Sequence, residues 1–326
     1  MRLKHILILS GIVALTFIAF FYFQKKHQRV DDFESFSFPA IKKISYHKND
    51  IDSLSGDSAV ISFILKNSVV KKFSFFDTSN CEYKSSPWIK ADFNNDGYTD
   101  LLVTGDTEYG DYVFAIEDSM GCKYKTQFIQ QVFTNCVISK VHTIDRYNAV
   151  FVNYFSPGDN DTVQYFWHTN IYVHEFDGFI EYNPTPTNYS IQKVEFSTTP
   201  CYGDCPVFDM TMDEHGNLDC QYKKFEYKGN WPDLKNFKLV TKHSDISQEE
   251  YLYLSRLLNY TDFTIYKSGS FDELSRGDFP VHTLKITYDK NRVKTLVFVP
   301  NFDLPQGFLK IRNLFLKKYY GIRKQD

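Results

Sequence analysis

Short apolar segments alternate with turn residues from residue 41 to about residue 182, and this pattern limits the folds that the chain can adopt. Strands of this length, bounded by pairs such as Gly105-Asp106 and Asp177-Gly178, are typical of all-β domains. An aromatic content of 17% also favours β structure. We therefore predict an all-β domain over residues 41–182. Its clearest strand-like segments are Ala59–Lys66, Val69–Phe76, Leu101–Thr104, Tyr112–Ile116, Ala149–Tyr154, Val163–His168 and Ile171–Glu175.

A break in this pattern divides the chain. Residues 183–189 contain Pro184 and Pro186 among Asn and Thr, a composition typical of a domain linker. Helical and strand patterns are mixed after it, which predicts an α+β domain over residues 190–321.

The first hairpin of this second domain can be predicted in register. Apolar and polar residues alternate on both sides of a turn at residues 213–217. Pairing Met212 with Leu218 places Cys220 opposite Met210. Cys220 is therefore predicted to be a core residue.

Two helices are predicted in the same domain. Ser247 and Glu250 have the spacing of a capping box. Pro305 and Gly321 are placed to start and end the last helix. The apolar stripe of the earlier helix is formed by Tyr251, Leu254, Leu257 and Leu258.

The N-terminus carries an uncharged apolar segment at residues 6–23. Its length is close to the minimum for a membrane-spanning helix. Bulky residues at positions 20–23 disfavour signal cleavage. We predict a membrane anchor or signal over residues 1–29, preferably an uncleaved helix, followed by a short stalk at residues 30–40. A cleaved signal peptide and a buried soluble helix are the alternatives.

The charge distribution excludes nucleic acid as a partner. The whole chain has 37 basic and 40 acidic residues. Five of the basic residues and none of the acidic ones lie in the first 29 positions, so the remainder has 32 basic and 40 acidic residues and a net charge of −8. Such a body lacks the positive surface that binds phosphate backbones.

One loop has the spacing of a calcium site. Residues 91–102 read ADFNNDGYTDLL, which contains a D-x-N-x-D-G-x-x-D pattern. Alternate residues of such a tight loop direct oxygen atoms at one centre, and Gly97 permits the turn. Val103 stands where an EF-hand has its last Glu, and the flanks read as strands. The predicted ligands are the side chains of Asp92, Asn94, Asp96 and Asp100 and the carbonyl of Tyr98.

The region from residue 88 to residue 116 resembles the FG-GAP/VCBS repeat, the blade unit of the integrin α-chain propeller. The resemblance implies a calcium loop between two strands. Only one clear copy is present, and the strands are too few for the roughly four to eight blades of a closed propeller. We therefore expect a partial propeller or an open sandwich. The alternative for the loop is an acidic β-turn that binds no metal.

A second motif lies at residues 199–208, which read TPCYGDCPVF. This C-[YF]-G-x-C-P run, with a late Asp-Phe-Pro at residues 278–280, resembles a bacterial domain family of unknown function over about residues 190–320. The resemblance implies an α+β domain on exported proteins and no known reaction. We favour a structural disulfide between Cys201 and Cys205. A redox pair, a metal site and free thiols remain as alternatives.

The sequence contains no catalytic motif for hydrolases, nucleotide binding or zinc proteases. Six Cys residues and a calcium-type loop suit an oxidising compartment outside the cytoplasm, the periplasm or the cell surface. We therefore expect a membrane-anchored envelope protein with a binding or structural role, whose partner is an envelope protein or a glycan. The alternatives are an envelope hydrolase acting on glycan or peptide, and a thiol–disulfide protein using Cys201 and Cys205.

Overall fold

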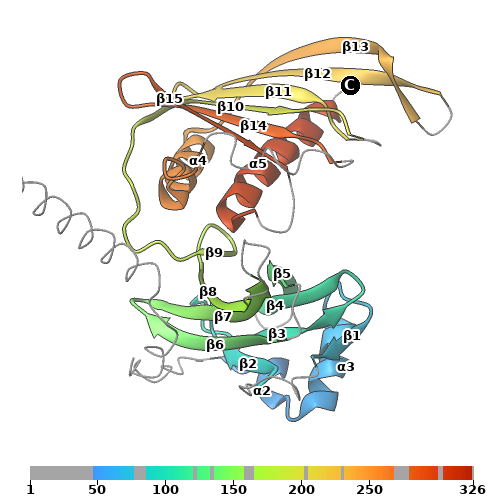
Figure 1. Ribbon diagram of the computed structural model, residues 1–326, viewed down its shortest axis with the longest axis vertical. Coiled ribbons are helices and arrows are strands. Elements are labelled where there is room, and N and C mark those ends of the chain that lie inside the picture. Colours follow the sequence, from blue (N-terminus) through green and yellow to red (C-terminus); the bar gives the residue numbers. More distant parts are fainter. Residues whose placement is uncertain are drawn as a thin grey trace, which may run out of the picture.

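The computed structural model contains two units that pack against each other (Figure 1). The first unit spans residues 47–182 and the second residues 190–324, and the segment at 183–189 between them has no regular structure. The residues that the structure describes are 47–76, 86–119, 123–132, 136–157, 165–201, 205–228, 231–267, 279–299 and 304–324.

The first unit opens with two short helices, α2 (Asp50–Ser53) and α3 (Asp57–Asn67). The predicted strand at Ala59–Lys66 is therefore wrong. Its β-branched residues suggested a strand, but the residues that become buried recur at helical spacing. These buried residues of α3 are Val60, Phe63 and Ile64.

A five-stranded antiparallel sheet follows, in which β3 pairs with three neighbours. The order is β1-β3-β4-β5, and β2 pairs with the first half of β3. β1 passes so close to β3 that a Cβ on Gly105 would lie 2.4 Å from the Ser74 carbonyl oxygen. The strands are β1 (Phe73–Phe75), β2 (Trp88–Ala91), β3 (Asp100–Thr107), β4 (Gly110–Ser119) and β5 (Lys123–Gln131).

The second sheet of this unit has four antiparallel strands in sequence order. One continuous strand, β8, occupies the place of the two strands predicted at Val163–His168 and Ile171–Glu175, because Thr169 and Asn170 pair with β7 instead of turning. The strands are β6 (Val137–Ile144), β7 (Tyr147–Pro157), β8 (Tyr165–His174) and β9 (Phe179–Glu181).

The two sheets pack face to face around a shared apolar core that includes Leu102 and Val113 from one sheet and Val150 and Val152 from the other. The opposite face of the five-stranded sheet is covered by α2 and α3. The prediction of an all-β domain is thus wrong at its first layer, which is helical.

The predicted N-terminal membrane helix is not supported. Residues 6–23 lie outside the described residues, as do the rest of the predicted anchor at 1–29 and the stalk at 30–40. In the described part of the chain, no helix has the length and apolar character needed to cross a bilayer. The fold that the structure supports is mostly β-sheet with helices on two faces.

The second unit is built on a six-stranded antiparallel sheet in the order β13-β12-β11-β10-β14-β15. Its first hairpin has the predicted register, with Met212 opposite Leu218 and Met210 opposite Cys220. Cys220 is a free, buried thiol, which confirms it as a core residue. The strands are β10 (Ile191–Thr198), β11 (Phe208–Asp213), β12 (Asn217–Lys228), β13 (Trp231–Asp245), β14 (His282–Tyr288) and β15 (Arg292–Phe298).

Two helices, α4 (Gln248–Thr261) and α5 (Gln306–Arg323), cover one face of this sheet. Ser247 and Glu250 form the predicted capping box, and the predicted apolar stripe is buried. Pro305 precedes α5 as predicted, but Gly321 lies inside the helix, which continues to Arg323. Gly321 has open space around its Cα, so no packing forces the helix to end there.

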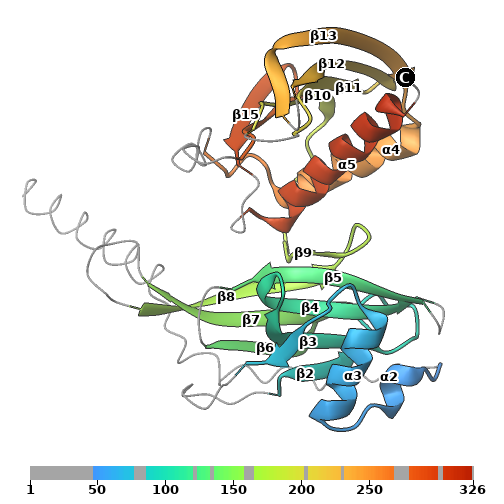
Figure 2. The same cartoon turned by 90° about the vertical axis from the view of Figure 1, so that its right-hand side faces the viewer.

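The helices α4 and α5 also face the first unit, where β9 lies beneath them (Figure 2). A single apolar core continues from the outer face of the four-stranded sheet through the helices to the six-stranded sheet. It includes Phe151 and Ile180 of the first unit and Leu257, Phe308 and Phe196 of the second.

Polar contacts fix α5 against the first unit. The Glu181 carboxylate accepts hydrogen bonds from the backbone N–H groups of Gln306 at 2.8 Å and Gly307 at 3.4 Å. The Gln306 side chain donates to the carbonyl of Ile129 at 2.8 Å. Lys310 donates to the carbonyl of Phe176 at 3.1 Å. A residue of β9 therefore supplies the cap that α5 lacks in its own sequence.

Glu181→Ala should destabilise the protein by about 1–2 kcal/mol, because two N–H groups of the first turn of α5 lose their acceptor. Glu181→Gln should cost less. It keeps one acceptor oxygen, and burial already raises the pKa of Glu181, which disfavours its charge. Urea denaturation measures both changes, with Glu214→Ala, an exposed residue in a turn, as the control. Equal stability of Glu181→Ala and wild type would contradict the capping role.

Candidate functional site

The predicted calcium-type loop joins β2 to β3, as expected, and closes where Ala91 pairs with Asp100. Asp92 accepts the backbone N–H groups of Asp96 at 3.2 Å and Gly97 at 3.0 Å. Asn94 also accepts the N–H of Asp96, at 3.0 Å. Gly97 has a φ of +91°, so the glycine provides the turn for which it was identified.

Two further residues of the loop serve its shape. Asp96 accepts the N–H of Tyr98 at 2.9 Å. Asp100 is fully buried and accepts the N–H groups of Phe93 at 2.9 Å and Asp118 at 2.8 Å. Asp100 therefore ties the loop to β4 as well as closing it.

Two carboxyl groups of the loop have raised pKa values. Burial and the Asp96 carboxylate raise the pKa of Asp92, and burial raises the pKa of Asp100 well above its usual range. Carboxylate, amide and carbonyl oxygens are the ligands that calcium takes. Within the described ranges, however, no three His, Cys, Asp or Glu side chains are grouped so that they could hold a metal ion. The calcium site therefore stays a prediction.

Cys201 and Cys205 are joined by a disulfide, with their Cα atoms 5.7 Å apart. Cys220 takes no part in it, and burial raises the pKa of its thiol to about 12. Cys136 is also disulfide-bonded, while Cys81 and Cys122 lie outside the described residues. The favoured alternative for the cysteine motif, a bond between its own two cysteines, is the one that the structure contains.

The end of β10 holds this motif beside another segment of the chain. The Thr198 hydroxyl donates to the carbonyl of Pro206 at 2.6 Å. The next residue, Thr199, exchanges hydrogen bonds with Val281, its N–H donating at 3.0 Å and its hydroxyl accepting at 2.9 Å. Two neighbouring threonines thus bring Cys205-Pro206 and Phe279-Pro280 to the same edge of the sheet, the one at which β10 ends between β11 and β14.

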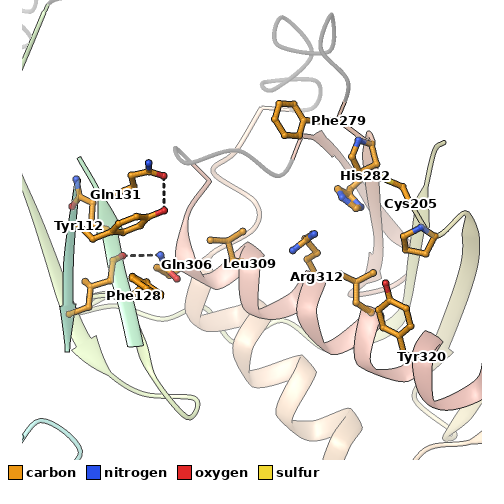
Figure 3. A pocket seen from close by; sticks show the side chains of 15 residues that line it. Tyr112, Phe128, Gln131, Cys205, Phe279, His282, Gln306, Leu309, Arg312 and Tyr320 are labelled. Carbon is orange, nitrogen blue, oxygen red and sulfur yellow. Dashed lines mark hydrogen bonds between the residues drawn. The ribbon is translucent and has the colours of Figure 1, made fainter. Parts of the chain in front are cut away.

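A cleft of about 510 Å³ opens at this edge, between the two units (Figure 3). Its size lies within the roughly 300–1,000 Å³ of small-molecule sites. Its walls come from β4, β5, α5 and the two segments held by β10. The lining residues are Tyr112, Phe128, Ile129, Gln130, Gln131, Cys205, Pro206, Phe279, Pro280, His282, Gln306, Leu309, Arg312, Leu316 and Tyr320.

The cleft has polar groups on both sides of an apolar residue, Leu309. Figure 3 shows Arg312 and His282 as neighbours on one side of Leu309 and Gln131 with Tyr112 on the other, and Cys205 and Tyr320 lie beyond Arg312. The Tyr112 hydroxyl donates to the Gln131 side chain at 2.9 Å. Arg312 is the one charged residue among the described lining residues.

Sequence reasoning missed this cleft, because its walls are far apart in the chain. Weak signals existed. His282 occupies an inward position in the alternation of β14, where apolar residues are expected. Arg312 lies beside Ile311 and Phe315 at the edge of the apolar stripe of α5. The sequence alone does not reveal which residue or ligand a polar side chain at such a position will contact.

Replacing both Cys201 and Cys205 with Ser should cost less than the ~3 kcal/mol that a 15-residue loop would give, because the closed loop is short. Cys220→Ser should cost about 1–3 kcal/mol, because it places a hydroxyl in the apolar core. Chemical denaturation of both variants provides the comparison. A double variant much less stable than Cys220→Ser would mean that the disulfide holds the whole second unit together.

Part of the chain matches a known protein family. Residues 192–315 match the family described as Domain of unknown function (DUF6438), and no FG-GAP/VCBS repeat is shown. No curated protein and no solved structure gives a significant match. The matched range contains the cysteine motif and the sheet edge, and it ends within α5. The chain therefore carries a DUF6438 domain of unknown function at residues 192–315, inside the range 190–320 predicted for a domain of this kind.

Proposed function

We propose that this protein is a non-catalytic binding protein that works outside the cytoplasm and takes a small ligand in the cleft between its two units. The observation that carries the proposal is the composition of the cleft. Apolar and aromatic side chains form most of its lining, with a few polar groups at its ends. This is the usual make-up of a ligand site.

Binding accounts for this lining better than glycan hydrolysis does. Glycosidases use a pair of carboxylates that flank the scissile bond. The lining residues that the structure describes include no Asp or Glu, and their charged group is the cation Arg312. The cleft thus offers charge and apolar surface for recognition, without the pair of carboxylates that this reaction needs.

A thiol–disulfide function has less support than binding. The bonded pair Cys201–Cys205 includes a residue that lines the cleft, Cys205, which is followed by the lining residue Pro206. A bond in that place helps to shape a site, and a persistent disulfide suits an oxidising compartment. The same reasoning supports the proposed location outside the cytoplasm.

We also propose that a bound calcium ion stabilises the first unit. The loop at residues 92–100 has the spacing of the FG-GAP/VCBS type, and the carboxylates of Asp92, Asp96 and Asp100 form no ion pair within the described part of the chain. A bound cation would relieve their mutual repulsion. No residue of the loop is among the described residues that line the cleft, so calcium would support the fold and not the ligand.

The cleft can be tested by filling it. Leu309→Trp places a large side chain between the two polar ends, whereas Leu252→Trp changes an exposed leucine on α4 that is 50% accessible. In ligand-observed NMR with a fragment library, some fragments should bind wild type and Leu252→Trp but not Leu309→Trp. If no fragment distinguishes the two tryptophan variants, the cleft is not the binding site.

The calcium site can be tested by thermal melting. Calcium should stabilise the wild type by about 2.7 kcal/mol at a hundredfold excess over its Kd, which is on the order of 10⁻⁴–10⁻³ M for extracellular modules. Asp96→Ala should abolish the shift, because it removes a predicted ligand, while the control Asp106→Ala, on the exposed side of β3, should keep it. Equal shifts in both variants, or none in the wild type, would show that the loop is only a turn.

A further inference from the structure

We propose that the ligand of the cleft carries a single carboxylate, which binds to Arg312 and His282, and an apolar body, which lies on Leu309. This inference rests on the binding function proposed above and adds the chemical class of the ligand.

Among the residues that the structure describes, the guanidinium of Arg312 has no acidic partner of the kind that a half-buried cation normally has. Its Nε is buried and has no hydrogen-bond partner, and its Nη1 donates to the side chain of Asn313 at 3.2 Å. No carboxylate among the described residues forms an ion pair with it. Burial lowers its pKa but leaves it charged at neutral pH. An unpaired charge in this position is costly, and an anionic ligand would remove the cost.

His282 adds a second unused donor beside Arg312. The residue is 2% exposed, and neither ring nitrogen has a hydrogen-bond partner in the described part of the chain. The ring is held by stacking on Phe196, with the centroids 5.4 Å apart. Burial and the nearby Arg312 lower its pKa to about 3, so the ring is neutral at physiological pH. It can therefore donate one hydrogen bond without adding charge.

Together these two side chains offer one positive charge and a donor from each, which match the single negative charge and the two oxygens of a carboxylate. One carboxylate can accept from the Arg312 guanidinium and from the His282 ring, because both side chains line the cleft and Figure 3 shows them as neighbours. With a single cation present among the described lining residues, a singly charged anion balances the site, whereas a phosphate dianion would leave excess negative charge.

The rest of the cleft determines what the carboxylate is attached to. Leu309 lies next to Arg312 in Figure 3, and Leu316 and Phe279 add further apolar surface to the lining. The far end offers the neutral side chains of Gln131 and Tyr112. The ligand is therefore an amphipathic monocarboxylate, with a free organic acid and the C-terminus of a peptide as its two possible sources.

Matched acids and amides test the charge. The probes are 3-phenylpropionate, octanoate and N-acetyl-Ala-Phe, each compared by isothermal titration calorimetry with its primary amide. At least one acid should bind about tenfold or more tightly than its amide, because the amide cannot form the charged pair. If only 3-phenylpropionate and octanoate bind, the source is a free organic acid. If only N-acetyl-Ala-Phe binds, the source is the C-terminus of a peptide. If every amide binds as tightly as its acid, or if phenyl phosphate binds more tightly than all the acids, the inference is wrong.

Variants assign the effect to the named residues. Arg312→Gln should reduce acid binding about tenfold and leave amide binding unchanged, and Arg312→Lys, which keeps the charge, should lose less. His282→Phe, which keeps the ring stacking, should also weaken acid binding. Lys317→Gln, an exposed lysine on the same helix, is the control with a matched charge and should change nothing. Arg312→Gln should melt no lower than wild type, because it removes an unpaired charge.

The outcomes separate this inference from the proposed function. If acids and amides bind equally and Leu309→Trp abolishes both, the cleft binds ligands but the carboxylate inference is wrong. The same holds if Arg312→Gln leaves acid binding unchanged. If Leu309→Trp leaves every ligand bound, or if neither these probes nor any library fragment binds, the proposed function fails and this inference fails with it.

Discussion

The position of α5 depends on a carboxylate that belongs to the other unit. Glu181, at the end of β9, accepts the first N–H groups of the helix, so α5 begins on the edge of a sheet more than a hundred residues earlier in the chain. Gly307 lets the same turn approach α4, because a Cβ there would lie 2.2 Å from the Thr261 hydroxyl oxygen. These contacts fix the direction of α5, and with it the place of Leu309 and Arg312 in the cleft.

Features that depend on near neighbours in the chain could be predicted from the sequence. The capping box at Ser247 and the hairpin that pairs Met210 with Cys220 both follow from local spacing. The segment that forms α3 reads as a strand because it is rich in β-branched residues, yet Val60 and Ile64 are buried at helical spacing. Residue type is therefore a poor guide to secondary structure where the spacing of the buried residues indicates another element.

The cleft could not be predicted, for a different reason. Tyr112, Cys205 and Arg312 meet there only after β4, the end of β10 and α5 have been packed together. The cysteine motif itself was visible in the sequence, but its role as a wall depends on Thr198 and Thr199, which hold it and Val281 at one edge. The sequence motifs in this protein therefore identify residues that fix the conformation of the chain. The groups suited to contact a ligand lie outside these motifs.

The placement of α5 between two sheets has a consequence for modularity. The matched family region ends at residue 315, inside the helix, yet the core around Phe308 includes Phe151 and Ile180 of the first unit. A boundary drawn from sequence similarity is thus not a boundary of independent folding. If the second unit were transplanted into another chain, it would carry an exposed apolar helix face and half a cleft. A protein that carried this helix without the first unit would have to supply another surface for it, and the shape of that surface would decide what the protein can bind.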